Sequence, residues 1–198
     1  MPVAKGGGAE GGGWEYGISE KDSYRSVIAD YKDAGEGEYG PQGLYLIQCE
    51  ERHPNGRLKT FAIFFNNTAL GTEEKRTKLR MMAEAVSGKR MPQEYANEHG
   101  IDAADLVGQS LRLTLDNKIS KNKEGQEAKF IVVTDYLPMR GADPLEVEEA
   151  EWPNWAVKKY GCPGGTIGKK KAKAAEPSAE EAWDGGSGEE ADDSAPIW

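Results

Sequence analysis

The stretch GLYLIQCEERHPNGRLKTFAIFF, residues 43–65, decides the fold of this chain. Its two halves are rich in apolar, β-branched and aromatic residues, a composition typical of strands. Between them lies the dipeptide Asn55-Gly56, which strongly favours a tight hairpin turn because both residues tolerate positive φ. The sequence therefore predicts two antiparallel strands joined by a hairpin, with the second strand over residues 57–65.

Alternation of apolar and polar residues predicts three further strands around this hairpin. Residues 24–31 alternate ahead of it, and the Gly/Glu/Pro-rich stretch AGEGEYGPQG breaks the chain before the hairpin begins. Downstream, Leu111, Leu113 and Leu115 alternate with polar residues in a half-buried strand. The last strand is expected over residues 128–136.

A helix is expected between the third and fourth strands. Thr72 can cap its N-terminus, and Gly88 can end it. Residues 91–107 are expected to add one or two short helical pieces. The buried stripe of the helix is predicted to contain Leu79, Met82, Ala83 and Val86. The basic residues expected to point elsewhere are Arg76, Lys78 and Arg80.

The resulting order of three strands, a helix and two strands matches a mostly β fold, the OB-fold. This fold is a five-stranded Greek-key barrel, here with a helix between strands 3 and 4. An SH3-like barrel is the nearest alternative, but it lacks the inserted helix. The predicted organisation is a flexible Gly-rich arm (1–21), an OB-fold domain (22–137), a Trp-containing extension packed on the barrel (138–168) and a disordered acidic tail (169–198).

Charge is distributed unevenly along the chain. The net charge is −9, but residues 52–90 hold nine Lys or Arg against three Glu. Residues 174–198 hold eight acidic residues and no base. A basic body with an acidic appendage suits a polyanion-binding protein whose tail competes for the same surface.

Composition also bounds the cellular setting. The mean hydropathy is −0.71, no apolar run reaches the length of a membrane span, and the first residues have no signal-peptide core. Cys49 and Cys162 lie too far apart in sequence to suggest a disulfide framework. We therefore expect a soluble cytoplasmic protein, with no membrane association.

Cations and aromatic rings on the strands and loops point to single-stranded nucleic acid, which is bound by phosphate contacts and base stacking. Any single Phe could instead belong to the barrel core, and the lysine-rich loop could be a solvated hairpin. The candidate DNA-binding residues are Tyr45, Arg57, Lys59, Phe61, Phe64, Phe65, Arg112, Lys118, Lys121, Lys123 and Tyr136. The sequence leaves open whether Trp152 and Trp155 pack or contact bases.

Catalytic and metal-binding patterns are weak. The chain has two His, and neither lies near a convincing nucleophile. Cys49 and His53 could ligate a metal, but a structural zinc needs four ligands. The GCPGGTIGKK segment fails the phosphate-loop pattern, since Pro163 stands where Gly is needed and Lys170 where Ser or Thr is needed. We expect no enzymatic activity, no cofactor and no metal.

The C-terminal tip is predicted to bind partner proteins. A solvated Ile and Trp are worth roughly 1.5–3 kcal/mol each when buried against a partner, and the neighbouring carboxylates would attract a basic cluster. An accidental end to a disordered tail is the alternative. The tip residues are Asp192, Asp193, Pro196, Ile197 and Trp198.

Barrel and tip together resemble the single-stranded DNA-binding proteins. Bacterial members end in an acidic tip with Asp residues, Pro and a terminal aromatic, although they usually place Phe directly after Pro. Over residues 22–137 the chain looks more like phage-encoded OB-fold binders, through its FAIFFNNT strand and TEEKRTKLRMMAEAV helix. If the chain is encoded by a bacteriophage, its setting is the host cytoplasm.

The resemblance implies binding of single-stranded DNA without strong sequence preference during DNA replication, recombination or repair. The acidic tip would recruit replication and recombination proteins, and homo-oligomers are an open possibility. Two alternatives remain at this stage: an acidic interaction protein that mimics DNA, and an RNA-binding OB barrel.

Overall fold

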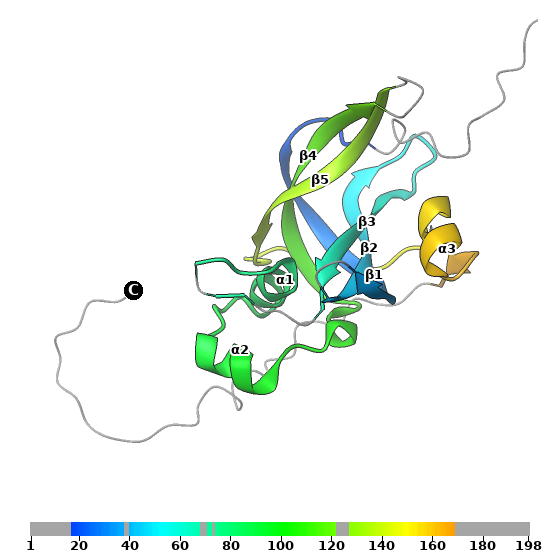
Figure 1. Cartoon of the computed structure of the whole chain (residues 1–198). Coiled ribbons are helices and arrows are strands. Elements are labelled where there is room, and N and C mark those ends of the chain that lie inside the picture. Colours follow the sequence, from blue (N-terminus) through cyan, green and yellow to red (C-terminus); the bar gives the residue numbers. More distant parts are fainter. Residues whose placement is uncertain (1–16, 38–39, 68–70, 73, 122–126, 169–198) are drawn as a thin grey trace, which may run out of the picture.

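The computed structural model describes residues 17–37, 40–67, 71–72, 74–121 and 127–168. Its main feature is a mostly β architecture with one antiparallel five-stranded sheet in the order β3-β2-β1-β4-β5 (Figure 1). The strands of this sheet are β1 (Asp22–Gly37), β2 (Gly40–Arg52), β3 (Leu58–Asn66), β4 (Ser110–Lys121) and β5 (Glu127–Leu137).

Short helices and a second small sheet complete the described residues. The helices are α1 (Lys78–Ser87), α2 (Gln93–His99), the 3-10 helix η2 (Ala103–Leu106) and α3 (Asn154–Tyr160). The second sheet pairs β6 (Ala150–Glu151) with β7 (Thr166–Ile167). Among these elements, none of the helices combines the length and the apolar character needed to cross a bilayer.

The β2–β3 hairpin forms as the sequence predicts. Tyr45 pairs with Ile63 and Leu44 with Phe64 in the antiparallel register. The turn closes where the backbone N–H of Gly56 donates to the carbonyl of His53 at 2.8 Å. Gly56 has φ of 83°, a conformation that most side chains resist. Local turn chemistry therefore sets the register of this hairpin.

The sheet is not closed into a barrel, which corrects the expectation of a closed five-stranded barrel. β3 and β5 are its two edges, and within the described residues no pairing joins them. Helix α1 contacts both edge strands as well as β4. Its Leu79 and Met82 are fully buried in one core with Ile63 of β3 and Ile131 of β5. Side chains of the helix thus fill the space that β3–β5 pairing would require.

Helix α1 begins later than the sequence suggests. Its N-cap is Thr77, whose side chain accepts from the backbone N–H of Arg80, whereas Thr72 accepts from Lys75 in the preceding turn. Gly88 ends the helix with φ of 71°, as predicted. The sequence also predicts that Arg80 points away from the buried stripe, but its side chain is fully buried.

The two faces of the sheet carry separate hydrophobic cores. On the inner face, α1, α2 and η2 cover side chains of all five strands. On the outer face, residues 145–167 cover β1 and β2, and Trp152 of this segment is 3% exposed. The indole N–H of Trp152 donates to Asp30 on β1 at 3.0 Å. The sheet is therefore covered on both sides over this region.

Residues 17–21, which the sequence places in the N-terminal arm, lie against the sheet. Ile18 is 1% exposed and belongs to the inner core. The side chain of Asn117 on β4 bonds to both its N–H and its carbonyl, at 2.9 and 2.8 Å. Residues 1–16 fall outside the described part of the chain.

Candidate nucleic-acid interface

Three of the candidate stacking rings belong to the inner core. Tyr45, Phe61 and Phe65 are 0%, 7% and 3% exposed. Tyr45 stacks on Phe65 with ring centroids 4.4 Å apart, and its hydroxyl donates to the carbonyl of Ala103 at 2.7 Å. A ring with both faces packed cannot stack on a base, so these three residues stabilise the fold and offer no binding surface.

Two further candidates are buried or partly buried. The ammonium of Lys59 donates to Glu51 at 2.6 Å and to the carbonyl of Gly17 at 2.5 Å, so an internal carboxylate already neutralises its charge. Tyr136 packs against the inner core, and burial raises the pKa of its hydroxyl to about 12. The Lys59 ammonium is therefore not free to contact a phosphate, and the Tyr136 ring is only partly accessible.

Several basic residues of the stretch 52–90 already form ion pairs with carboxylates within the protein. Arg52 pairs with Glu148 at 2.7 Å, and Glu84 receives both Arg76 at 2.6 Å and Arg80 at 3.0 Å. The sequence count therefore overstates the positive surface that this stretch presents. The basic residues of the stretch that remain exposed outside these pairs include Arg57, Lys75, Lys89 and Arg90.

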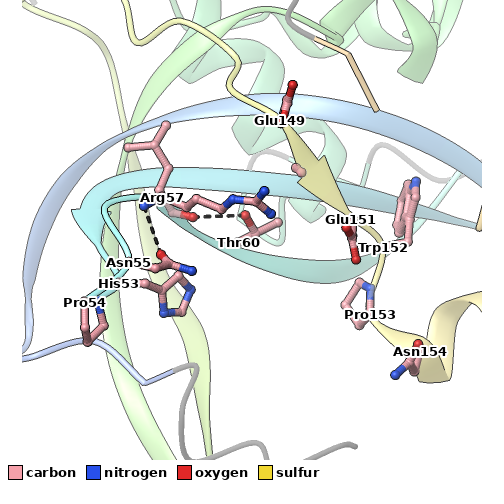
Figure 2. Close-up of a pocket in the computed structure, with 12 residues that line it drawn as sticks. His53, Pro54, Asn55, Arg57, Thr60, Glu149, Glu151, Trp152, Pro153 and Asn154 are labelled. Carbon is pink, nitrogen blue, oxygen red and sulfur yellow. Dashed lines mark hydrogen bonds between the residues drawn. The ribbon is translucent and has the colours of Figure 1, made fainter. Parts of the chain in front are cut away.

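Arg57 lies at the β2–β3 turn beside a groove of about 680 Å³. Figure 2 shows the hairpin on one side of this groove and the segment around β6 on the other. Glu149 and Glu151 line the second side. A groove lined by two glutamates and one arginine makes a poor phosphate site, because each carboxylate repels an anion. The groove is therefore the weaker candidate for DNA.

The end of the β4–β5 hairpin is the most open of the predicted sites. We call residues 118–121 and 127–130 the β4–β5 arm; Figure 1 shows this hairpin extending away from α1 and α2. Lys118 is exposed and pairs in register with Phe130, which is 37% exposed. Lys121 is exposed near Glu127 at 3.5 Å, and Lys123 falls outside the described residues.

Sequence reasoning missed Phe130, although the signal was present. Within the strand 128–136, Ile131 and Val133 occupy the inner face. Alternation therefore places Phe130 on the opposite face, where it lies beside Lys118. Cross-strand neighbours of this kind have Cβ atoms about 4.5–5.5 Å apart. The structure thus brings an exposed ring and an ammonium group together on one face of the arm.

Arg112 precedes the arm on the outer face of β4. It is half-buried, and its guanidinium donates to the carbonyl of Ser23 on β1 at 2.9 Å. This bond ties β4 to β1 and leaves part of the guanidinium accessible. Arg112 therefore helps to hold β4 against β1, and its charge is only partly accessible to a phosphate.

Phe64 lies in neither of these places. It packs on the outer face, in an aromatic group with Trp155 and Tyr160 of α3. Trp155 is 45% exposed, whereas Trp152 is buried. The structure thus separates the two tryptophans whose roles the sequence left open.

Comparison of the sequence with known proteins does not assign this chain to a family. No protein-family model matches this chain, and no curated protein has a significantly similar sequence.

The remaining predicted features concern metals and partners. Within the residues that the structure describes, no group of three or more His, Cys, Asp or Glu could hold a metal ion. Cys49 and Cys162 are buried in the cores on opposite faces of the sheet, and burial raises the pKa of the Cys49 thiol to about 12. All five tip residues, Asp192, Asp193, Pro196, Ile197 and Trp198, lie outside the described residues.

Proposed function

We propose that this protein binds single-stranded DNA without strong sequence preference during DNA replication, recombination or repair. The observation that carries the proposal is the exposed ring of Phe130 beside Lys118 on the β4–β5 arm. Proteins that bind single strands in this way combine base stacking, worth about 1–3 kcal/mol per base, with cations along the phosphates. The arm supplies both groups on one face.

The strand order supports an open relative of the OB-fold. β1 lies at the centre, and the β2–β3 and β4–β5 hairpins flank it. Joining the two edge strands would complete a five-stranded barrel, and helix α1 follows β3 as in that fold. OB-folds bind oligonucleotides with the loop between strands 4 and 5, among other surfaces. The position of the arm matches this use.

We further propose that the acidic tip recruits replication and recombination proteins. A tip of aspartates followed by Ile197 and Trp198 offers carboxylates for a basic pocket and apolar groups for its centre. A tether keeps such a tip at a high local concentration around bound DNA. The acidic tail would also compete weakly with DNA for the lysines of the β4–β5 arm.

Titration of the full chain with oligo-dT at low and high salt tests the proposal. Affinity should fall steeply with salt, because each phosphate contact on a single strand contributes a slope of about −0.7. Deletion of residues 174–198 should keep or tighten the binding. Absence of binding to unpaired oligonucleotides in low salt would refute the proposal.

An acidic DNA mimic is the second candidate. The observation in its favour is that Arg52, Lys59, Arg76 and Arg80 are already paired with carboxylates, while the chain carries a net charge of −9. A DNA mimic would capture a DNA-handling enzyme and would ignore oligo-dT. An RNA-binding role is the third candidate, and competition between RNA and DNA oligonucleotides of one sequence distinguishes it.

A further inference from the structure

The outer face of β2, and part of that of β3, is covered by the chain itself. OB-folds commonly bind oligonucleotides on the face formed by strands 2 and 3. Here Trp152, Ala156 and other residues of 145–167 pack on the outer face of β1 and β2, and Ala62 and Phe64 of β3 are partly buried against the same core. Any nucleotide contact on this side must therefore involve the outer surface of the covering segment. The buried residues of this core are Val27, Ala29, Leu44, Leu46, Val147, Ala150, Trp152, Ala156 and Cys162.

The covering segment presents an ordered aromatic group at its surface. The Trp155 ring lies 5.7 Å from Phe64 with the planes 31° apart, and Tyr160 meets Phe64 edge-on at 5.0 Å. Trp155 and Tyr160 contact each other edge-on at 6.1 Å. Three mutually packed rings hold the indole in place, yet Trp155 remains 45% exposed. Such a ring offers a stacking surface that would lose little side-chain conformational entropy when a base binds.

Three lysines lie on the elements that carry or adjoin these rings, and one of them contacts a ring. Lys159 places its Nζ 5.1 Å from the centre of the Tyr160 ring, and Lys158 is exposed beside it on α3. Lys78 reaches from α1 to the carbonyl of Phe64 at 3.0 Å and is also exposed. An exposed aromatic ring bordered by cations is complementary to a base flanked by phosphates.

We propose that Trp155, Tyr160, Lys158 and Lys159 form a second contact surface for single-stranded DNA. One base stacks on the exposed indole, and the two lysines contact the flanking phosphates. Lys78 adds a third cation from the β3 side. This inference rests on the proposed function, and it places the contact on the covering segment in addition to the β4–β5 arm.

Substitution of Trp155 tests the stacking contact. Trp155→Ala should weaken binding to a long oligo-dT by about 5- to 150-fold, the range that corresponds to loss of one stacked base. Trp155→Phe should recover most of the affinity, because a flat ring remains. Tyr95→Ala on α2, which removes a ring stacked on His99 far from this surface in the fold, is the matched control and should bind normally.

Tryptophan fluorescence distinguishes base stacking on Trp155 from a purely structural role of this residue, because only stacking would quench its emission. Oligo-dT should quench the wild-type emission, and Trp155→Phe should lose a large part of that quenching. Lys158→Gln with Lys159→Gln should make the salt slope shallower by about 1.4, since two phosphate contacts disappear. Near-UV circular dichroism and thermal unfolding establish that each variant remains folded.

Failure of this inference can be distinguished from failure of the proposed function. If the wild type ignores oligo-dT, the proposed function fails. If the wild type binds and folded Trp155→Ala binds equally well with unchanged quenching, only the second surface is refuted. Binding of a peptide of residues 174–198 to the same variants provides a further test. If Trp155→Ala loses binding to that peptide and keeps full affinity for oligo-dT, the occupant is an acidic peptide and the inference is overturned.

Discussion

Arg80 and Glu84, one turn apart on α1, form an ion pair of 3.0 Å in which the guanidinium is fully buried. The same guanidinium donates to Gln93 and to the carbonyl of Met91, both at 2.6 Å. Glu84 in turn accepts from the backbone N–H of Met91 at 3.2 Å. The pair therefore fastens the start of α2 to α1 and satisfies buried polar groups on both.

Removal of one partner of this pair should destabilise the fold strongly. Arg80→Ala leaves Glu84 without its buried partner and should cost about 3–5 kcal/mol in the free energy of unfolding. Arg80→Lys should rescue little, because an ammonium cannot reproduce the planar fork of donors. Urea unfolding measures both. The control is Arg76→Ala, whose more exposed pair with the same Glu84 should cost about 0–1 kcal/mol.

Acid should destabilise the protein through Glu51. Burial favours the neutral form of this carboxyl, but hydrogen bonds from Lys59 and Ser19 outweigh that effect and hold its pKa below the ordinary value of 4.5. A carboxyl with a lowered folded pKa adds stability above its unfolded pKa. That stability is lost as the pH falls below 4.5 and through the folded pKa.

Glu51→Gln should remove this part of the acid dependence and cost about 2 kcal/mol near neutral pH. Thermal unfolding midpoints across a pH series provide the measurement. The exposed Glu98→Gln on α2 is the control for loss of one negative charge. An unchanged acid profile in Glu51→Gln would show that the pair with Lys59 does not contribute.

Substitutions on the β4–β5 arm should weaken DNA binding by two separable routes. Phe130→Ala should cost about 1–3 kcal/mol in affinity through lost stacking, and Lys118→Gln should make the salt slope shallower by about 0.7. Ile119→Ala is the matched control. Ile119 is 62% exposed and follows Lys118 on β4, so its side chain lies on the opposite face of the arm. Equal loss of affinity in all three variants would contradict a contact confined to one face.

Trp152 should hold the covering segment on the sheet. Trp152→Ala should cost about 3–5 kcal/mol, the range for removing a large buried aromatic side chain. Limited proteolysis should then cut within residues 138–168 more readily. Trp152→Phe keeps most of the apolar surface and loses the bond to Asp30, so it should cost about 1 kcal/mol. Resistance of Trp152→Ala to proteolysis would show that other contacts hold the segment.

Local features of the chain were predictable. The turn at Asn55-Gly56, the end of α1 at Gly88 and the helical stripe around Leu79 follow from backbone preference and periodicity. The five strands and the helix after the third were also found in order. Each of these depends on residues close together in sequence, whose conformational preferences act without distant partners.

The candidate site was only partly predictable. Lys118 and Lys121 are exposed as expected, but Tyr45 and Phe65 stack on each other in the core. Composition identifies rings and cations without showing which of them already have partners. Lys59 illustrates the point, because its carboxylate partner lies on the neighbouring strand of the hairpin.

The amino-acid sequence alone determined the order of strands and helices and the position of the turns, since hydrogen-bond geometry and side-chain period act over a few residues. Only the tertiary structure decided that the sheet stays open at β3 and β5, that Arg80 is buried, and that Trp152 packs while Trp155 faces solvent. These outcomes depend on packing between segments far apart in the chain, where volume and charge pairing select one arrangement.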